Sequence, residues 1–139
     1  MSSTLQNKQS ASAVAVVGAG YWGKNLVRNF HDLHALEVIC DVDEERTQAY
    51  QGQYPGVRIL HAYSEVLGDK SINAVAIATP AETHESFVRE ALLAGKDVFV
   101  EKPLCLSVSQ GEELVALARR QGRILMVGHL LWYHPAVLK

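Results

Sequence analysis

The stretch that decides the fold is AVAVVGAGYWG, residues 13–23. Its first five residues are apolar and either small or β-branched, a composition typical of a buried strand. The glycines that follow, Gly18, Gly20 and Gly23, fit the pattern G-x-G-x-x-G. Apolar residues then recur at helical spacing as far as Phe30. The glycines therefore stand between a strand and a helix, which is the context that gives this pattern structural meaning.

Each glycine of this turn has a physical role. Gly18 allows a tight turn out of the strand, Gly20 lets the backbone approach a pyrophosphate, and Gly23 lets the helix pack close to the strand. The start of the helix offers unpaired N–H groups and a positive dipole end to phosphates. Tyr21 and Trp22 lie within the turn; we expect Trp22 to be at least partly in the core, or its indole to cover the pyrophosphate edge. We predict a dinucleotide-binding turn; the alternative is a turn that only packs a helix on a sheet.

Length and composition set the broad class of the protein. A chain of 139 residues with 48% hydrophobic residues can form one globular domain. The net charge is −2 and the basic residues are scattered, which argues against a nucleic-acid partner. Apolar runs are too short to cross a membrane, and the polar residues 1–12 read as a flexible leader rather than a secretory signal. The predicted location is the cytoplasm.

The two cysteines predict no metal site. Cys40 and Cys105 form no C-x-x-C pattern, and no histidine lies at metal-ligand spacing from them. We therefore interpret them as reduced thiols of a cytoplasmic protein.

Strands and helices are expected to alternate along the whole chain. The expected strands are 13–17, 36–40, 58–60, 74–78, 97–100 and 124–127, and the expected helices are 22–33, 44–54, 63–67, 82–94 and 107–121. Continuous apolar strands separated by helices indicate a parallel sheet covered on both faces. Right-handed crossovers then give an α/β, doubly wound Rossmann fold with strand order 3-2-1-4-5-6 over residues 13–129.

Asp41 is the candidate ligand for a ribose. It ends the second predicted strand, 18 residues after Gly23, which is close to the spacing of the acid that accepts both ribose hydroxyls. A carboxylate there repels a 2′-phosphate, so NAD is favoured over NADP. Arg46 is the one nearby residue that could reverse this preference. The alternative role for Asp41, capping the next helix, suits Asp43 better.

Ligands of doubly wound sheets bind beyond the carboxyl ends of the strands. The side chains expected at those ends are Asp41, Thr79, Glu101, Lys102 and His129. Thr79 and Pro80 are predicted to line a cofactor cleft, with the alternative that Pro80 simply ends the strand. His84 stands near the start of the next helix, either beside the cofactor or as an exposed histidine of the first helical turn.

Several motifs together resemble the Gfo/Idh/MocA family of oxidoreductases. They are the glycine turn 18–23, the tripeptide Glu101-Lys102-Pro103 at a strand end, and Ala78-Thr79-Pro80 with His84 four residues after Pro80. The tail GHLLWYHPA, residues 128–136, is similar to the nucleotide-sugar branch, such as the UDP-N-acetylhexosaminuronate dehydrogenases. The resemblance covers nearly the whole chain.

The resemblance implies roles for specific residues. Lys102 would be catalytic, either as a base or as a cation that polarises the substrate oxygen; the alternative is a solvated lysine that follows a strand. Glu101 would lie beside the nicotinamide ribose or carboxamide, unless it is a surface carboxylate paired with Lys102. His129 and His134 would contact substrate, although His134 could simply precede a helix that starts at Pro135. The family's second, substrate-binding domain is expected to be absent here, with residues 130–139 as the start of the linker to it.

The predicted function is that of the NAD-binding domain of an oxidoreductase that transfers hydride between NAD and a sugar or nucleotide-sugar hydroxyl. The alternative is a non-catalytic dinucleotide-binding module, or a shortened chain that is inactive on its own. Binding of another nucleotide such as S-adenosylmethionine is less favoured, because the Glu-Lys-Pro turn would then have no purpose. The family context also allows a homo-oligomer, and residues 130–133 are expected to form an exposed apolar patch.

Overall fold

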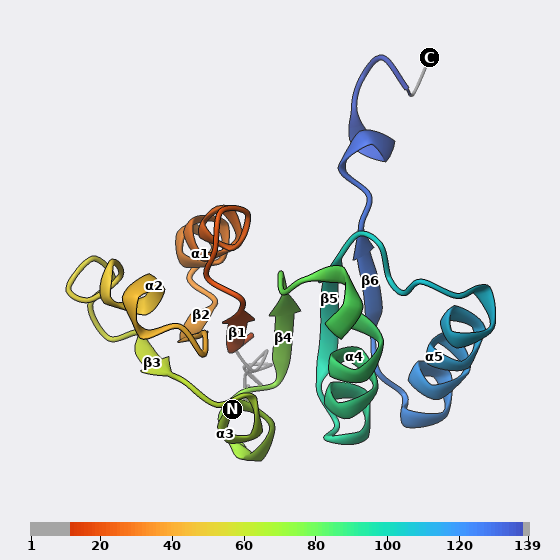
Figure 1. Ribbon diagram of the computed structural model, residues 1–139, viewed down its shortest axis with the longest axis horizontal. Coiled ribbons are helices and arrows are strands. Elements are labelled where there is room, and N and C mark those ends of the chain that lie inside the picture. The colour runs from red at the N-terminus through yellow and green to blue at the C-terminus, as the bar shows by residue number, and fades with distance from the viewer. Residues whose placement is uncertain (1–11, 138–139) are drawn as a thin grey trace, which may run out of the picture.

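A single parallel sheet forms the framework of the molecule in the computed structural model, which describes residues 12–137. Six strands lie in the order β3-β2-β1-β4-β5-β6, and all neighbouring strands run parallel (Figure 1). Their bounds are β1 Val14–Val17, β2 Leu36–Cys40, β3 Arg58–Leu60, β4 Ala74–Ile77, β5 Asp97–Glu101 and β6 Leu125–Gly128. The predicted doubly wound order is therefore confirmed. The predicted leader lies outside the described residues, apart from Ser12.

The connections between strands are helical. They are α1 Gly23–Asp32, α2 Glu44–Gln48, α3 Tyr63–Gly68, α4 His84–Leu93 and α5 Val108–Gln121, with 3₁₀ turns η1 Ala81–Thr83 and η2 Leu130–Tyr133. The C-terminal turn η2 extends beyond the carboxyl end of β6 (Figure 1). Leu130 and Tyr133 within it are exposed, whereas the side chains of Leu131 and Trp132, the other two residues of the expected apolar patch, lie outside those that the structure describes.

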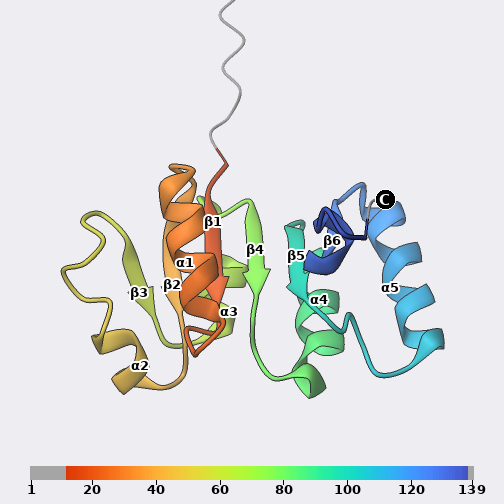
Figure 2. The same ribbon diagram turned by 90° about the horizontal axis from the view of Figure 1, so that it is seen from above.

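Helices lie on both sides of the sheet (Figures 1 and 2). On one face, Val66 of α3, Leu92 of α4 and Leu114 of α5 are fully buried in a common cluster. On the other face, Leu26 and Val27 of α1 pack in a second cluster that includes core residues of β1 and β2. The apolar composition of the strands is thus explained by burial from two sides.

The second face is covered less completely than the sequence predicts. The α1 helix reaches β5 through an edge-to-face contact of Phe30 with Phe99, whose ring centroids are 6.4 Å apart. Beyond that contact, Ile124, just before β6, and Met126, on β6, are 67% and 44% exposed. The expectation of cover on both faces is therefore wrong over β6, within residues 12–137. Right-handed crossovers carry α4 and α5 to the opposite face, so neither can cover this one.

Two predicted helix boundaries also differ. The helix expected over 44–54 ends at Gln48, and Tyr50 then turns inward so that its hydroxyl donates to the Ala19 carbonyl at 3.1 Å. The helix expected over 82–94 begins with the 3₁₀ turn η1, in which the Thr83 amide donates to the Pro80 carbonyl at 2.9 Å. Both differences arise from polar contacts that a hydrophobic pattern does not report.

Candidate functional site

The glycine turn between β1 and α1 is built from close backbone contacts. Gly18 has a φ of +94°, in the region that favours glycine, and a Cβ there would lie 2.7 Å from the carbonyl carbon and oxygen of Ala78. A Cβ on Gly23 would lie 1.8 Å from the carbonyl oxygen of Gly18. These two glycines therefore bring β1, β4 and the start of α1 into direct contact.

Gly20 differs from Gly18 and Gly23 because the position that its Cβ would occupy is open. The nearest atoms to that position belong to the Arg46 guanidinium, at 3.9 Å and 4.0 Å. The following helix α1 has no side-chain cap at Trp22 and no acidic residue in its first turn. The protein thus leaves the positive end of α1 uncompensated beside an open stretch of backbone, which is the arrangement that binds a phosphate group.

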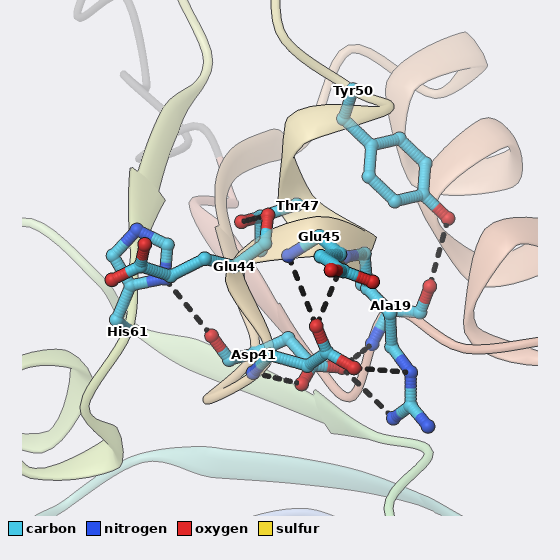
Figure 3. Close-up of polar contacts among 9 residues, drawn as sticks. Ala19, Asp41, Glu44, Glu45, Thr47, Tyr50 and His61 are labelled. Carbon is cyan, nitrogen blue, oxygen red and sulfur yellow. Dashed lines mark hydrogen bonds and ion pairs between the residues drawn. The ribbon is translucent and has the colours of Figure 1, made fainter.

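Asp41 joins the end of β2 to the glycine turn (Figure 3). Its carboxylate is buried, and Oδ2 accepts a hydrogen bond from the Ala19 amide at 2.8 Å. Oδ1 accepts from the Asp43 amide at 2.9 Å, while Asp43 itself caps α2, as predicted. Each carboxylate oxygen has a further lone pair available, so Asp41 can still accept hydrogen bonds from a ligand hydroxyl.

A cavity of about 500 Å³ lies in front of this turn. The predicted cofactor residues that line it are Gly18, Gly20, Tyr21, Asp41, Thr79 and Pro80. Its volume is within the range of small-molecule sites, which run to several hundred Å³.

The same cavity has an uncharged wall that the sequence analysis missed. The Tyr63 ring stacks on Phe87 with centroids 4.3 Å apart, and its hydroxyl donates to the Phe87 carbonyl at 2.7 Å. Burial raises the pKa of Tyr63, and burial together with Asp41 raises the pKa of the Cys40 thiol to about 12. These groups are neutral at physiological pH, and such a wall suits an uncharged ring. The only sequence signal for Tyr63 was its place after the end of β3.

A second cavity of about 310 Å³ adjoins the first. The predicted residues Trp22, Thr79, His84, Glu101 and Lys102 line it. Thr79, at the end of β4, lines both cavities. The two cavities therefore lie next to each other at the carboxyl edge of the sheet, the larger one at the glycine turn and the smaller one at Lys102.

His84 connects the segments that form this second cavity. It is 2% exposed, so the interpretation as an exposed histidine of the first helical turn is wrong. Its Nδ1 lies 2.6 Å from the Pro103 carbonyl oxygen and its Nε2 lies 2.8 Å from the Thr79 carbonyl oxygen. The ring is buried because it fits between these two carbonyls, and it links the end of β4 to the segment that carries Lys102.

The structure does not bring the two predicted substrate histidines into either cavity. His129 and His134 are both exposed, and His134 Nδ1 accepts a hydrogen bond from the Ala136 amide at 3.2 Å. Gly23 also lies outside the lining, because it faces the Gly18 carbonyl. Among residues 12–137, no His, Cys, Asp and Glu side chains are grouped to hold a metal ion. No helix within this range is long and apolar enough to span a membrane.

Comparison with known proteins identifies the family of this chain. Residues 12–129 match the family model described as an oxidoreductase family with an NAD-binding Rossmann fold, GFO/IDH/MocA. D-apiose dehydrogenase of Paraburkholderia graminis is 32% identical over 126 residues, covering 88% of this chain and 33% of that protein.

Two solved structures illustrate the cofactors of such proteins. GenD2 from gentamicin A biosynthesis, in complex with NAD, is 32% identical with a TM-score of 0.83, covering 89% of this chain and 36% of that one. A 3-ketoreductase from Actinomadura kijaniata, in complex with NADP and TDP-benzene, is 28% identical with a TM-score of 0.81, covering 89% and 39%.

The chain thus spans about a third of the length of these relatives. The strand order agrees with the Rossmann fold that the matched family model describes. The chain belongs to the GFO/IDH/MocA oxidoreductase family and forms its NAD-binding Rossmann domain.

Proposed function

We propose that this chain holds NAD for hydride transfer to or from a hydroxyl-bearing carbon of a sugar or nucleotide sugar. The observation that carries the proposal is the pair of adjoining cavities, with the glycine turn and Asp41 at one and Lys102 at the other. A dinucleotide has two ends joined by a pyrophosphate, and this arrangement offers a place for each part.

The residues present fit the cofactor. The open backbone at Gly20 and the uncapped start of α1 would hold the pyrophosphate, and Asp41 would accept the ribose hydroxyls. Thr79 and His84 would bound the second cavity, where the nicotinamide would lie. NAD when bound supplies the hydride acceptor, and the protein supplies position and charge.

Lys102 is the residue proposed to act on the substrate. When a carbinol is oxidised, its C–H bond breaks and hydride leaves with the electron pair, while the O–H proton passes to a base. An ammonium group at this place would stabilise the oxygen as its charge changes, and a neutral amine would take the proton. His84 contacts the carbonyl of Pro103, the residue after Lys102, and this contact holds the backbone that carries the lysine in place.

The substrate class is inferred from relatives. One acts on D-apiose by its name and another holds TDP-benzene beside NADP. We place further substrate contacts at His129 and His134, with residues 130–139 leading to a substrate domain in the longer protein. We also infer a cytoplasmic location, where NAD and reduced thiols occur together, and a homo-oligomer.

The test measures turnover and binding separately. The protein is incubated with NAD and a panel of sugars and nucleotide sugars, and NADH absorbance is followed. Lys102→Ala should reduce turnover by about 100-fold or more and leave NAD affinity within a few fold, since proton transfer contributes about that much. Lys70→Ala, an exposed lysine outside both cavities, is the matched control.

Unchanged turnover in Lys102→Ala would contradict the catalytic assignment. NAD binding by the wild type without turnover on any substrate would favour the alternative of a non-catalytic binding module.

A further inference from the structure

Arg46 lies at the glycine turn, on the wall of the larger cavity. Its Nη1 is 3.7 Å from Asp41 Oδ2, and its Nε is 3.4 Å from Asp43 Oδ2. Its guanidinium also provides the nearest atoms to the open Cβ position of Gly20. The arginine side chain is therefore placed where the ribose of a bound dinucleotide meets Asp41.

The position of Arg46 depends on Asp43. Asp43 Oδ1 caps α2 by accepting from the Glu45 and Arg46 amides at 3.0 Å and 3.4 Å. Its other oxygen, Oδ2, faces the guanidinium of Arg46, one helical turn later. Asp43 therefore both starts the helix that carries Arg46 and holds its side chain toward Asp41.

The three side chains together carry one net negative charge. A guanidinium has five donors in a planar fork and is suited to a phosphate group. Here the carboxylates of Asp41 and Asp43 already face the Arg46 guanidinium. They offset its positive charge where it borders the cavity. A 2′-phosphate that entered this place would meet Asp41 and an arginine whose charge is already balanced.

We propose that Asp43 and Arg46 determine the choice between NAD and NADP at this site. Asp43 restrains the guanidinium and thereby enforces the preference for NAD that Asp41 creates. Removal of the Asp43 charge frees Arg46 to pair with a 2′-phosphate. This inference rests on the proposed function, since it assigns the cofactor specificity of the same site.

The experiment measures dissociation constants of NAD and NADP by calorimetry for the wild type, Asp43→Asn, Arg46→Ala and the double variant. Asparagine caps a helix as well as aspartate, so Asp43→Asn removes the charge and keeps α2. The preference for NAD over NADP should fall by about 3- to 10-fold in Asp43→Asn, through tighter NADP binding. The expected change is of this size because the freed Arg46 contributes one solvent-screened positive charge opposite a doubly charged phosphate.

The double variant shows whether Arg46 transmits this effect. With Arg46→Ala in the background, Asp43→Asn should change the preference by less than half as much. The change in preference that Asp43→Asn causes should also shrink in 1 M salt, where the screening length is about 3 Å. Asp32→Asn, an exposed carboxylate at the far end of α1, is the control for a change of net charge and should leave the preference unchanged.

An unchanged preference in Asp43→Asn would overturn the inference. So would an effect of Asp43→Asn on the preference that is equally large with and without Arg46→Ala, because the arginine would then not transmit it. Wild-type protein that binds neither cofactor would instead refute the proposed function itself. Thermal unfolding of each variant shows whether the fold is retained.

Discussion

Two glycines of the turn should respond differently to the same substitution: Gly23→Ala should lower stability, and Gly20→Ala should lower NAD affinity. A Cβ on Gly23 would lie 1.8 Å from the Gly18 carbonyl oxygen, and real Cβ contacts do not fall below 3.0 Å. Gly23→Ala therefore forces the start of α1 and the turn apart by about 1.2 Å. Overpacking of this kind costs about 1–3 kcal/mol, which lowers the melting temperature by about 5–15 °C in a domain of this size.

Gly20→Ala adds the same methyl group with a different result. Its Cβ would meet the Arg46 guanidinium at 3.9 Å, which is ordinary contact, and Gly20 is not among the positive-φ glycines. Stability should stay within about 1 kcal/mol of the wild type, or rise slightly, because alanine restricts the unfolded chain. The methyl group would nevertheless stand where the pyrophosphate approaches, so NAD affinity should fall about tenfold or more.

The assay pairs thermal unfolding with NAD calorimetry on the wild type and the two variants. The expected result is a folded Gly20→Ala protein that binds NAD poorly, and a Gly23→Ala protein with a clearly lower melting temperature. Normal NAD binding by Gly20→Ala would refute the role given to the open backbone. Equal destabilisation of both variants would refute the contact geometry of the turn.

Three further predictions follow from buried or hydrogen-bonded groups. His84→Ala leaves two carbonyl oxygens without the ring, so the free energy of unfolding in urea should fall by about 2–4 kcal/mol; a wild-type value would contradict the link between the two strand ends. Hydrogen bonds, that from Ser71 foremost, lower the pKa of Asp69 to about 2, so its stabilisation is present above pH ~4 and lost as pH falls toward 2. Asp69→Asn should therefore flatten the acid limb of the stability curve, and an unchanged limb would rule this out. Burial raises the pKa of Cys40 to about 12, so a thiol reagent at pH 8 should label Cys105 alone until urea exposes both; rapid native labelling of both would disprove it.

The sheet could be predicted from the sequence because its signal is local. The apolar strand β1 and the glycines after it give both the element and the turn, and the alternation with helices gives the parallel topology. Asp41 could be placed by counting from the glycines, since strand and helix lengths fix where β2 ends. The position of Lys102 also followed, because carboxyl ends of parallel strands meet at one edge.

The parts that could not be predicted depend on contacts between distant segments. His84 looks like an ordinary first-turn histidine until the Thr79 and Pro103 carbonyls are placed around it. The predicted helix 44–54 is too long because nothing in its polar composition shows that Tyr50 turns toward Ala19. The two ion pairs of Arg46 depend in the same way on how α2 is placed beside the glycine turn.

The central claim is that the glycine turn and Asp41 form a functional NAD site. The most direct measurement is a calorimetric titration of the purified chain with NAD and with NADP, beside Asp41→Ala. NAD should bind more tightly than NADP, and this preference should weaken in the variant, because the carboxylate that accepts ribose hydroxyls and repels a 2′-phosphate is gone. Absence of binding to either cofactor, in a protein that is folded by circular dichroism, would contradict it.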